Sequence, residues 1–156
     1  MAQVIEYLQG LASAILVGKV VLLSFVVAPI LAKSLERELF GKVVRQLFPA
    51  YYALGMGASI LGLVSIGILA MIRGMSSSVM LAGGIWLIIL SAEVYCRFFL
   101  TPQSNEMRDR LKEQESRGAA DPALQNAWNR LHQRSVYLNS MVLLAGLYLI
   151  WLAQRL

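Results

Sequence analysis

Four long apolar stretches, separated by shorter polar segments, dominate the pattern of side chains along this chain. The stretches lie at about residues 8–31, 50–72, 79–100 and 135–154. A run of ~20 apolar residues is long enough to cross the ~30 Å hydrocarbon core of a bilayer as a helix. The pattern therefore predicts an all-α fold, a four-transmembrane-helix bundle that forms a single integral membrane domain over residues 1–156.

The polar segment after the first stretch predicts an amphipathic helix. Between residues 33 and 48, apolar side chains repeat every four residues along one face, and charged side chains occupy the other. This spacing is typical of a helix that lies on the membrane surface. Pro49 is expected to end this helix, and Tyr51 and Tyr52 follow where an interfacial aromatic belt would lie.

The polar segment after the third stretch predicts helices that extend beyond the membrane. The third span is expected to end at Thr101-Pro102, and residues 105–117 then carry the mixed charges typical of a solvated helix. Asp121-Pro122 is a helix start signal, with Asp as N-cap and Pro at the first helical position. Since the apolar periodicity continues from there into the last span, helical extensions of spans 3 and 4 are predicted on one side.

Composition and charge agree with a membrane protein. Hydrophobic residues make up 58% of the chain and charged residues 15%, against ~45–50% and ~25% in soluble domains. The net charge of +5 comes from loops beside the spans, so it does not indicate a nucleic-acid partner. Both larger loops are expected in the cytoplasm and both termini on the other side, because eleven basic residues flank one membrane face. The opposite face has only Arg73 and Arg155.

Motifs for catalysis are missing from the sequence. The chain has no Gly-rich phosphate loop, cysteine pair, nucleophile triad or paired-histidine motif, so no catalytic residue is predicted and no enzyme activity is indicated. The single cysteine, Cys96, allows no disulfide within the chain. No secretory signal peptide is predicted, because residues 1–7 contain no basic residue and the first apolar stretch is too long.

Glu93 lies inside the third apolar stretch and is the most informative residue. Inserting a carboxylate at this depth costs at least ~2.5 kcal/mol of free energy, so Glu93 is expected to have an ion-pair partner or a functional role. Arg97 lies four residues later, a spacing that favours a pair, and Lys19 in the first stretch is a second candidate partner. Two hypotheses fit: a structural ion pair that fixes helix register, and a proton relay, ion relay or polar substrate site.

A helical rise of ~1.5 Å per residue gives the distance of each residue from the end of its span. By this estimate, other polar residues lie at a depth in the membrane close to that of Glu93. His132, Ser135 and Asn139 share one face of the final helix, towards which Glu93 is able to point. The candidate functional cluster, at the cytoplasmic mouth of the bundle, is Lys19, Glu93, Arg97, His132, Ser135 and Asn139.

Metal or haem binding is a secondary hypothesis. Met71, Met75 and Met80 lie near the opposite end of the second and third spans, and thioethers suit Cu(I). No cysteine or histidine accompanies them there, so we expect chance packing and no metal site. His132 is the only histidine, and a headgroup or loop contact suits it better than haem ligation. No cofactor is expected, with haem or copper as the alternatives.

Three segments together resemble the transmembrane protein 205-like family. The first matches a Phe-Gly…Leu-Phe-Pro-x-Tyr signature, at Phe40-Gly41 and Leu47-Phe48-Pro49-Ala50-Tyr51. The second is Thr101-Pro102 followed by Met107 and Arg110, and the third is Leu131-His132-x-x-Ser135-x-x-x-Asn139. The resemblance gives weight to Gly41, Phe48, Pro49, Tyr51 and Pro102 as family-motif residues.

The resemblance implies a four-helix membrane protein without an established reaction. The eukaryotic members are associated with drug or metal resistance and with secretory-pathway membranes. The chain also has a more distant similarity to copper-resistance-D-like proteins, some relatives of which bind haem. Its single histidine does not fit haem ligation by two histidines within one subunit.

The leading functional hypothesis is a small transporter- or channel-like subunit in the lipid bilayer. The alternatives are a haem- or metal-binding redox protein and a structural or assembly subunit without a site. Four helices enclose little volume, so a translocating form is expected to be a homo-oligomer or part of a membrane complex. The small residues on the first two spans would serve such contacts.

Overall fold

The computed structural model describes residues 1–118 and 121–155, and its regular structure there is entirely helical. In chain order the elements are α1 (Ala2–Val21), the π-helical η1 (Leu22–Val27), α2 (Ala28–Ser34), α3 (Arg37–Arg73), α4 (Ser77–Tyr95), the π-helical η2 (Cys96–Leu100), α5 (Thr101–Ser116), α6 (Pro122–Leu152) and the short 3-10 helix η3 (Ala153–Arg155). Four of the resulting rods are long and apolar enough to cross a membrane. The predicted all-α bundle is confirmed.

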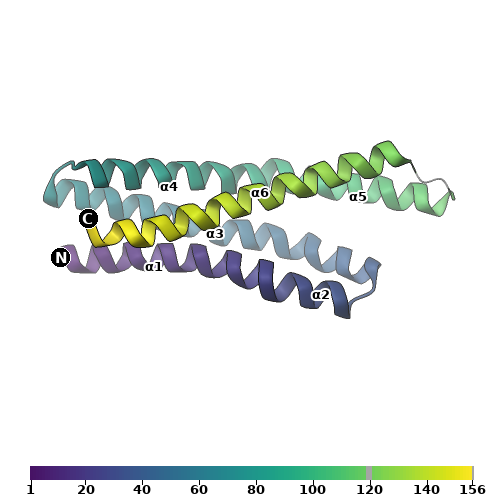
Figure 1. The fold of residues 1–156 in the computed structure, drawn as a ribbon, viewed down its shortest axis with the longest axis horizontal. Coiled ribbons are helices and arrows are strands. Elements are labelled where there is room, and N and C mark those ends of the chain that lie inside the picture. Colours follow the sequence, from purple (N-terminus) through teal and green to yellow (C-terminus); the bar gives the residue numbers. More distant parts are fainter. Residues whose placement is uncertain (119–120, 156) are drawn as a thin grey trace.

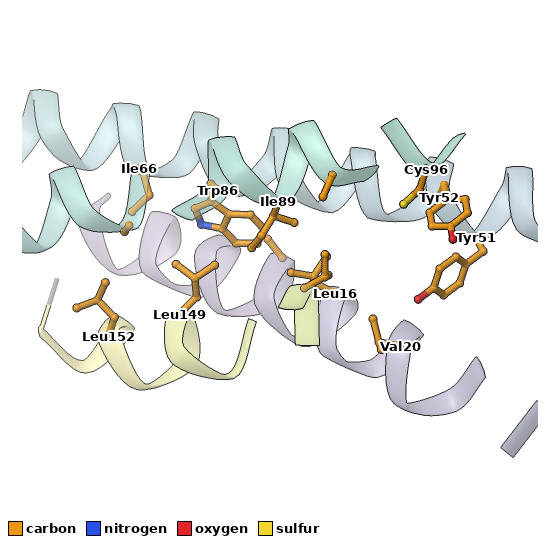
Figure 2. Close-up of a cluster of buried hydrophobic side chains, with 14 of the residues drawn as sticks. Leu16, Val20, Tyr51, Tyr52, Ile66, Trp86, Ile89, Cys96, Leu149 and Leu152 are labelled. Carbon is orange, nitrogen blue, oxygen red and sulfur yellow. The ribbon is translucent and has the colours of Figure 1, made fainter. Parts of the chain in front are cut away.

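The rods lie side by side along the long axis, and both termini are at the same end (Figure 1). Helix α1 packs against α3 and α6, and α4 packs against the same two helices. Their shared core contains the fully buried side chains of Leu16, Trp86, Ile89 and Leu149 (Figure 2). At the other end, α5 and the first half of α6 project beyond the core, as predicted for extensions of spans 3 and 4 (Figure 1). We call this projecting part, with the first turns of α3, the charged end.

The prediction of a separate surface helix before Pro49 is wrong. Helix α3 is continuous from Arg37 to Arg73 and contains Pro49 in its interior. A proline there removes one backbone hydrogen bond and disfavours the helix. Contacts with α5 stabilise the extended form, since the charged face of the amphipathic segment meets the charged face of α5. The ion pairs between them are Arg37–Glu115 at 2.9 Å, Glu38–Lys112 at 3.1 Å and Arg45–Asp109 at 2.5 Å.

The third span was expected to end at Thr101-Pro102, but the helix continues through Pro102, and the first rod likewise continues through Pro29. Pro29 and Pro102 each follow a π-helical segment by two residues. Proline lacks an N–H and its ring collides with the carbonyl four residues earlier, so a widened turn before it relieves the clash. The Thr101 hydroxyl donates to the Cys96 carbonyl at 2.7 Å, which satisfies one backbone acceptor across η2.

Side-chain caps mark two helix starts. The Asp121 carboxylate accepts from the Ala123 N–H at 2.8 Å, which confirms the predicted start of α6. The Ser76 hydroxyl accepts from the Val79 N–H at 3.2 Å at the start of α4. Before it, Gly74 ends α3 at a φ of 86°, a backbone angle that favours glycine.

Gly62 provides a test of the packing between α3 and α4. A Cβ at Gly62 would overlap the indole ring of Trp86, whereas a Cβ at the exposed Gly57 would meet nothing within 4 Å. We expect Gly62→Val to lower the free energy of unfolding by at least ~1–3 kcal/mol, the usual cost of overpacking. Thermal unfolding in detergent micelles measures this, with Gly57→Val as the matched control. Equal midpoints for the two variants would contradict the packing.

Candidate functional site

A buried ion pair joins α1 to α4. The Lys19 ammonium lies 2.6 Å from Glu93 Oε1, and both side chains are only 2% exposed. Lys19 lies on the face of α1 that also buries Leu16, and Glu93 on the face of α4 that buries Trp86 and Ile89. The apolar periodicity that packs these helices therefore also brings the two charges together.

A glycine on α3 makes room for the pair. A Cβ at Gly55 would overlap both the Glu93 carboxyl group and the Lys19 ammonium group. The predicted small-residue face of the second span thus divides into two parts. Gly55 and Gly62 are buried against side chains of other helices, whereas Gly57 and Gly67 are exposed.

Two tyrosines cover the lysine. Lys19 Nζ lies 4.0 Å from the ring centroid of Tyr51 and 5.6 Å from that of Tyr52, distances at which a cation is attracted to an aromatic face. Phe48 packs edge-on against Tyr51 and stacks on Tyr52. The two tyrosine rings lie next to Cys96 at one end of the apolar core (Figure 2). The prediction that they form an interfacial belt is wrong, because both are buried.

Hydrogen bonds connect the tyrosines to α6. The Tyr51 hydroxyl donates to Asn139 Oδ1 at 2.7 Å, and Asn139 Nδ2 donates to the Ser135 carbonyl at 2.8 Å. The Tyr52 hydroxyl lies 3.3 Å from the Ser135 hydroxyl. Asn139 and Ser135 are partly exposed, so polar groups continue from the buried ion pair to the surface of α6.

The second oxygen of Glu93 is buried without a partner. Glu93 Oε2 forms no hydrogen bond with the described residues. A buried, unsatisfied polar atom costs ~1–3 kcal/mol, and more when it is charged. The ion pair is therefore incompletely compensated.

The two remaining residues of the predicted cluster, Arg97 and His132, are not part of the network of the ion pair, the tyrosines, Ser135 and Asn139. Arg97 donates to the Pro49 carbonyl at 2.5 Å, so the arginine binds the backbone of α3 while Lys19 pairs with Glu93. His132 is exposed, although it shares a helix with Ser135 and Asn139. Among the family-motif residues, Gly41 lies at the charged end against Arg108.

The weak metal candidates do not gather into an enclosed site. Met71, Met75 and Met80 are 87%, 70% and 64% exposed. Within residues 1–118 and 121–155, no group of three or more His, Cys, Asp or Glu side chains is placed to bind a metal ion.

Sequence reasoning missed the buried polar residue Gln9 on α1. With its amide nitrogen donating to the Gly62 carbonyl at 3.1 Å, its oxygen accepts from Trp86 Nε1 at 2.6 Å. The amide thus satisfies the indole N–H in the middle of the core. The helical spacing places Gln9 on the buried face of α1 that also contains Leu16 and Val20. A single glutamine near a terminus, however, does not by itself indicate a buried hydrogen bond.

Breaking the ion pair tests whether it is as buried as its geometry indicates. We expect Lys19→Met to lower the free energy of unfolding by ~3–5 kcal/mol, because the Glu93 charge is left without its partner. The double variant Lys19→Met with Glu93→Leu should regain most of this loss, since an apolar pair of similar volume suits the site. Thermal unfolding in detergent measures both. Additive losses would show that the two side chains do not interact.

Comparison with known proteins identifies a family but no activity. A search of curated proteins finds no match, and neither does a search of solved structures. One family model, described as "Domain of unknown function (DUF4149)", matches residues 11–113, which is more than half of the chain. That range contains Lys19, Gly55 and Glu93, together with both π-helical segments. The chain therefore belongs to the DUF4149 family.

Proposed function

We propose that this protein is a small transporter-like membrane protein in which protonation of Glu93 opens the Lys19–Glu93 ion pair. The observation that carries the proposal is the placement of this pair. It is buried, one carboxylate oxygen forms no hydrogen bond with the described residues, and a π-helical segment follows each of its two residues. Ionisable side chains inside a membrane bundle commonly belong to proton or ion pathways.

Protonation would change the balance of forces at the pair. A neutral Glu93 side chain no longer attracts the Lys19 ammonium by charge, while the ammonium keeps its contact with the Tyr51 ring. Because the site is shielded from water, losing the opposite charge removes a large part of what holds α1 against α4 there.

The two π-helical segments supply positions at which the helices would bend. Segment η1 starts three residues after Lys19, and η2 starts three residues after Glu93. Such segments occur often at functional sites and mark places where a helix bends. No residue of η1 or α2 is buried, so the second half of the first rod is loosely packed on the bundle. Opening the pair would let it move.

Polar side chains provide a path from the pair towards the charged end. Tyr51, Asn139 and Ser135 follow one another from the buried ammonium to the partly exposed surface of α6. We propose that this end faces the cytoplasm, as the excess of basic residues beside it favours.

The resemblance to the transmembrane protein 205-like family supports the proposal of a transporter-like protein. Its association with drug or metal resistance agrees with movement of a solute. We also propose a homo-oligomer, because Gly10 and Gly18 have nothing within 4 Å outside α1. Such small-residue positions let a second helix approach closely.

Proton movement in vesicles tests the proposal. Purified protein is placed in liposomes that contain a pH-sensitive dye, and a proton gradient is imposed with the membrane potential clamped. We expect the wild type to dissipate the gradient faster than empty liposomes do, and Glu93→Gln to fall to the empty level. Ser91→Ala is the control, because the Ser91 hydroxyl bonds to its own helix on an exposed face. Equal rates for Glu93→Gln and wild type would overturn the proposal.

Cys96 offers a second measurement of the same event. It is the single cysteine, is only 2% exposed and lies beside Tyr52 (Figure 2). At one fixed pH, we expect the Cys96 thiol to react faster with a maleimide in Glu93→Gln than in wild type or Ser91→Ala. The reason is that the ion pair that holds the helices together is missing from Glu93→Gln. Unchanged labelling in a folded Glu93→Gln protein would contradict an opening at this site.

A further inference from the structure

A pocket lies at the charged end, separate from the ion pair. It has a volume of about 640 Å³ and is formed by the start of α3, the second half of α5 and the first turns of α6. Charged side chains from α3 and α5 form much of its wall. Apolar contact surface comes from Phe40, Leu111 and Trp128.

Positive charge is in excess in this pocket. Its lining includes five basic side chains, Arg37, Lys42, Arg45, Arg108 and Lys112, and three acidic ones, Glu38, Asp109 and Glu115. Arg37 pairs with Glu115, and Arg45 with Asp109. Lys42 and Lys112 share Glu38, at 3.3 and 3.1 Å. One carboxylate therefore serves two lysines, and Arg108 is left over.

Arg108 is the unusual member of the set. In the described part of the chain it forms no ion pair, and its guanidinium contacts the Gly41 carbonyl at 3.3 Å and the Trp128 ring at 5.1 Å. Burial and the nearby Arg45 guanidinium lower the pKa of Arg108. A guanidinium nevertheless stays charged, so a partly desolvated positive charge lies here and forms no ion pair with the described residues.

We propose that this pocket binds the phosphate group of a molecule that carries a net negative charge and also has an apolar part. A guanidinium presents parallel N–H donors that match two phosphate oxygens. The shared lysines supply further positive charge, and Trp128 with Phe40 and Leu111 provides surface for the apolar part. Two sources carry this chemistry: the headgroup of an anionic phospholipid, and a soluble phosphate ester.

Gly41, a family-motif residue, shapes the approach to this site. Its carbonyl accepts from Arg108, and a Cβ there would lie 3.5 Å from Arg108 Cδ, an ordinary contact distance. Alanine should therefore be tolerated at this position. A leucine would extend further into the space that Arg108 occupies and displace the guanidinium.

Ligand titration of the detergent-solubilised full chain tests the proposal. The probes are short-chain phosphatidylglycerol, phosphatidylcholine of equal chain length and glycerol 3-phosphate, and the readouts are the thermal midpoint and calorimetric affinity. We expect saturable binding of phosphatidylglycerol that Arg108→Gln weakens about tenfold or more, as for loss of a charge-assisted bond. Arg117→Gln is the matched control, because Arg117 pairs with Glu113 and is not part of the pocket lining.

Each outcome decides the proposal. Binding of phosphatidylglycerol alone supports a lipid headgroup site, and binding of glycerol 3-phosphate as well supports a site for soluble phosphate esters. Equal affinity for phosphatidylcholine, binding of none of the three, or equal effects of Arg108→Gln and Arg117→Gln overturn it. Gly41→Leu, compared with Gly41→Ala, repeats the test without removing a charge, so a folding defect of Arg108→Gln does not leave the answer open.

Discussion

The cost of burying two charges among apolar helices is the constraint on which the rest of this structure depends. A lysine and a glutamate at 2% exposure require close contact, because each charge alone would be expelled from such a site. Their 2.6 Å separation fixes how α1 and α4 lie along each other. Gly55 on α3 must then lack a side chain, and the tyrosine rings must face the ammonium. The polar bonds to α6 follow from the same arrangement.

Prolines divide the bundle into two unlike parts. Between the termini and the ion pair, the rods are regular α-helices with a closely packed core around Trp86 and Leu149. Beyond the pair, Pro29 and Pro102 follow widened helical turns, and Pro49 lies where Arg97 binds its carbonyl. The regular half of the bundle therefore keeps its backbone hydrogen bonds, whereas the proline-containing half lacks some of them.

The charged end is held by different forces from the core. Ion pairs between α3 and α5 are exposed, and each contributes ~0–1 kcal/mol in water. They stabilise α3 beyond Pro49 mainly by acting together, and among the described residues none of these ion pairs includes Arg108. Extending these helices thus gathers an excess of basic side chains at the charged end, where the Gly41 carbonyl accepts from Arg108.

Elements that depend on composition and local chemistry could be predicted from the amino-acid sequence. Apolar length predicted the four spans, and Asp121-Pro122 predicted the start of α6, because hydration and capping act within one segment. Spacing along the helices also predicted a polar cluster near one end of the spans, made of Lys19, Glu93, Arg97, His132, Ser135 and Asn139. Both Arg97 and Lys19 were candidate partners of Glu93, because the spacing of residues does not predict how each helix is rotated about its own axis.

Which side chains meet depends on how the helices pack in three dimensions. Packing turned Lys19 towards Glu93, directed Arg97 to the Pro49 carbonyl and left His132 exposed. Packing also keeps α3 continuous at Pro49, because its contacts with α5 outweigh the tendency of proline to break a helix. Local preferences of this kind amount to a few kcal/mol, and the sum of contacts between helices exceeds them.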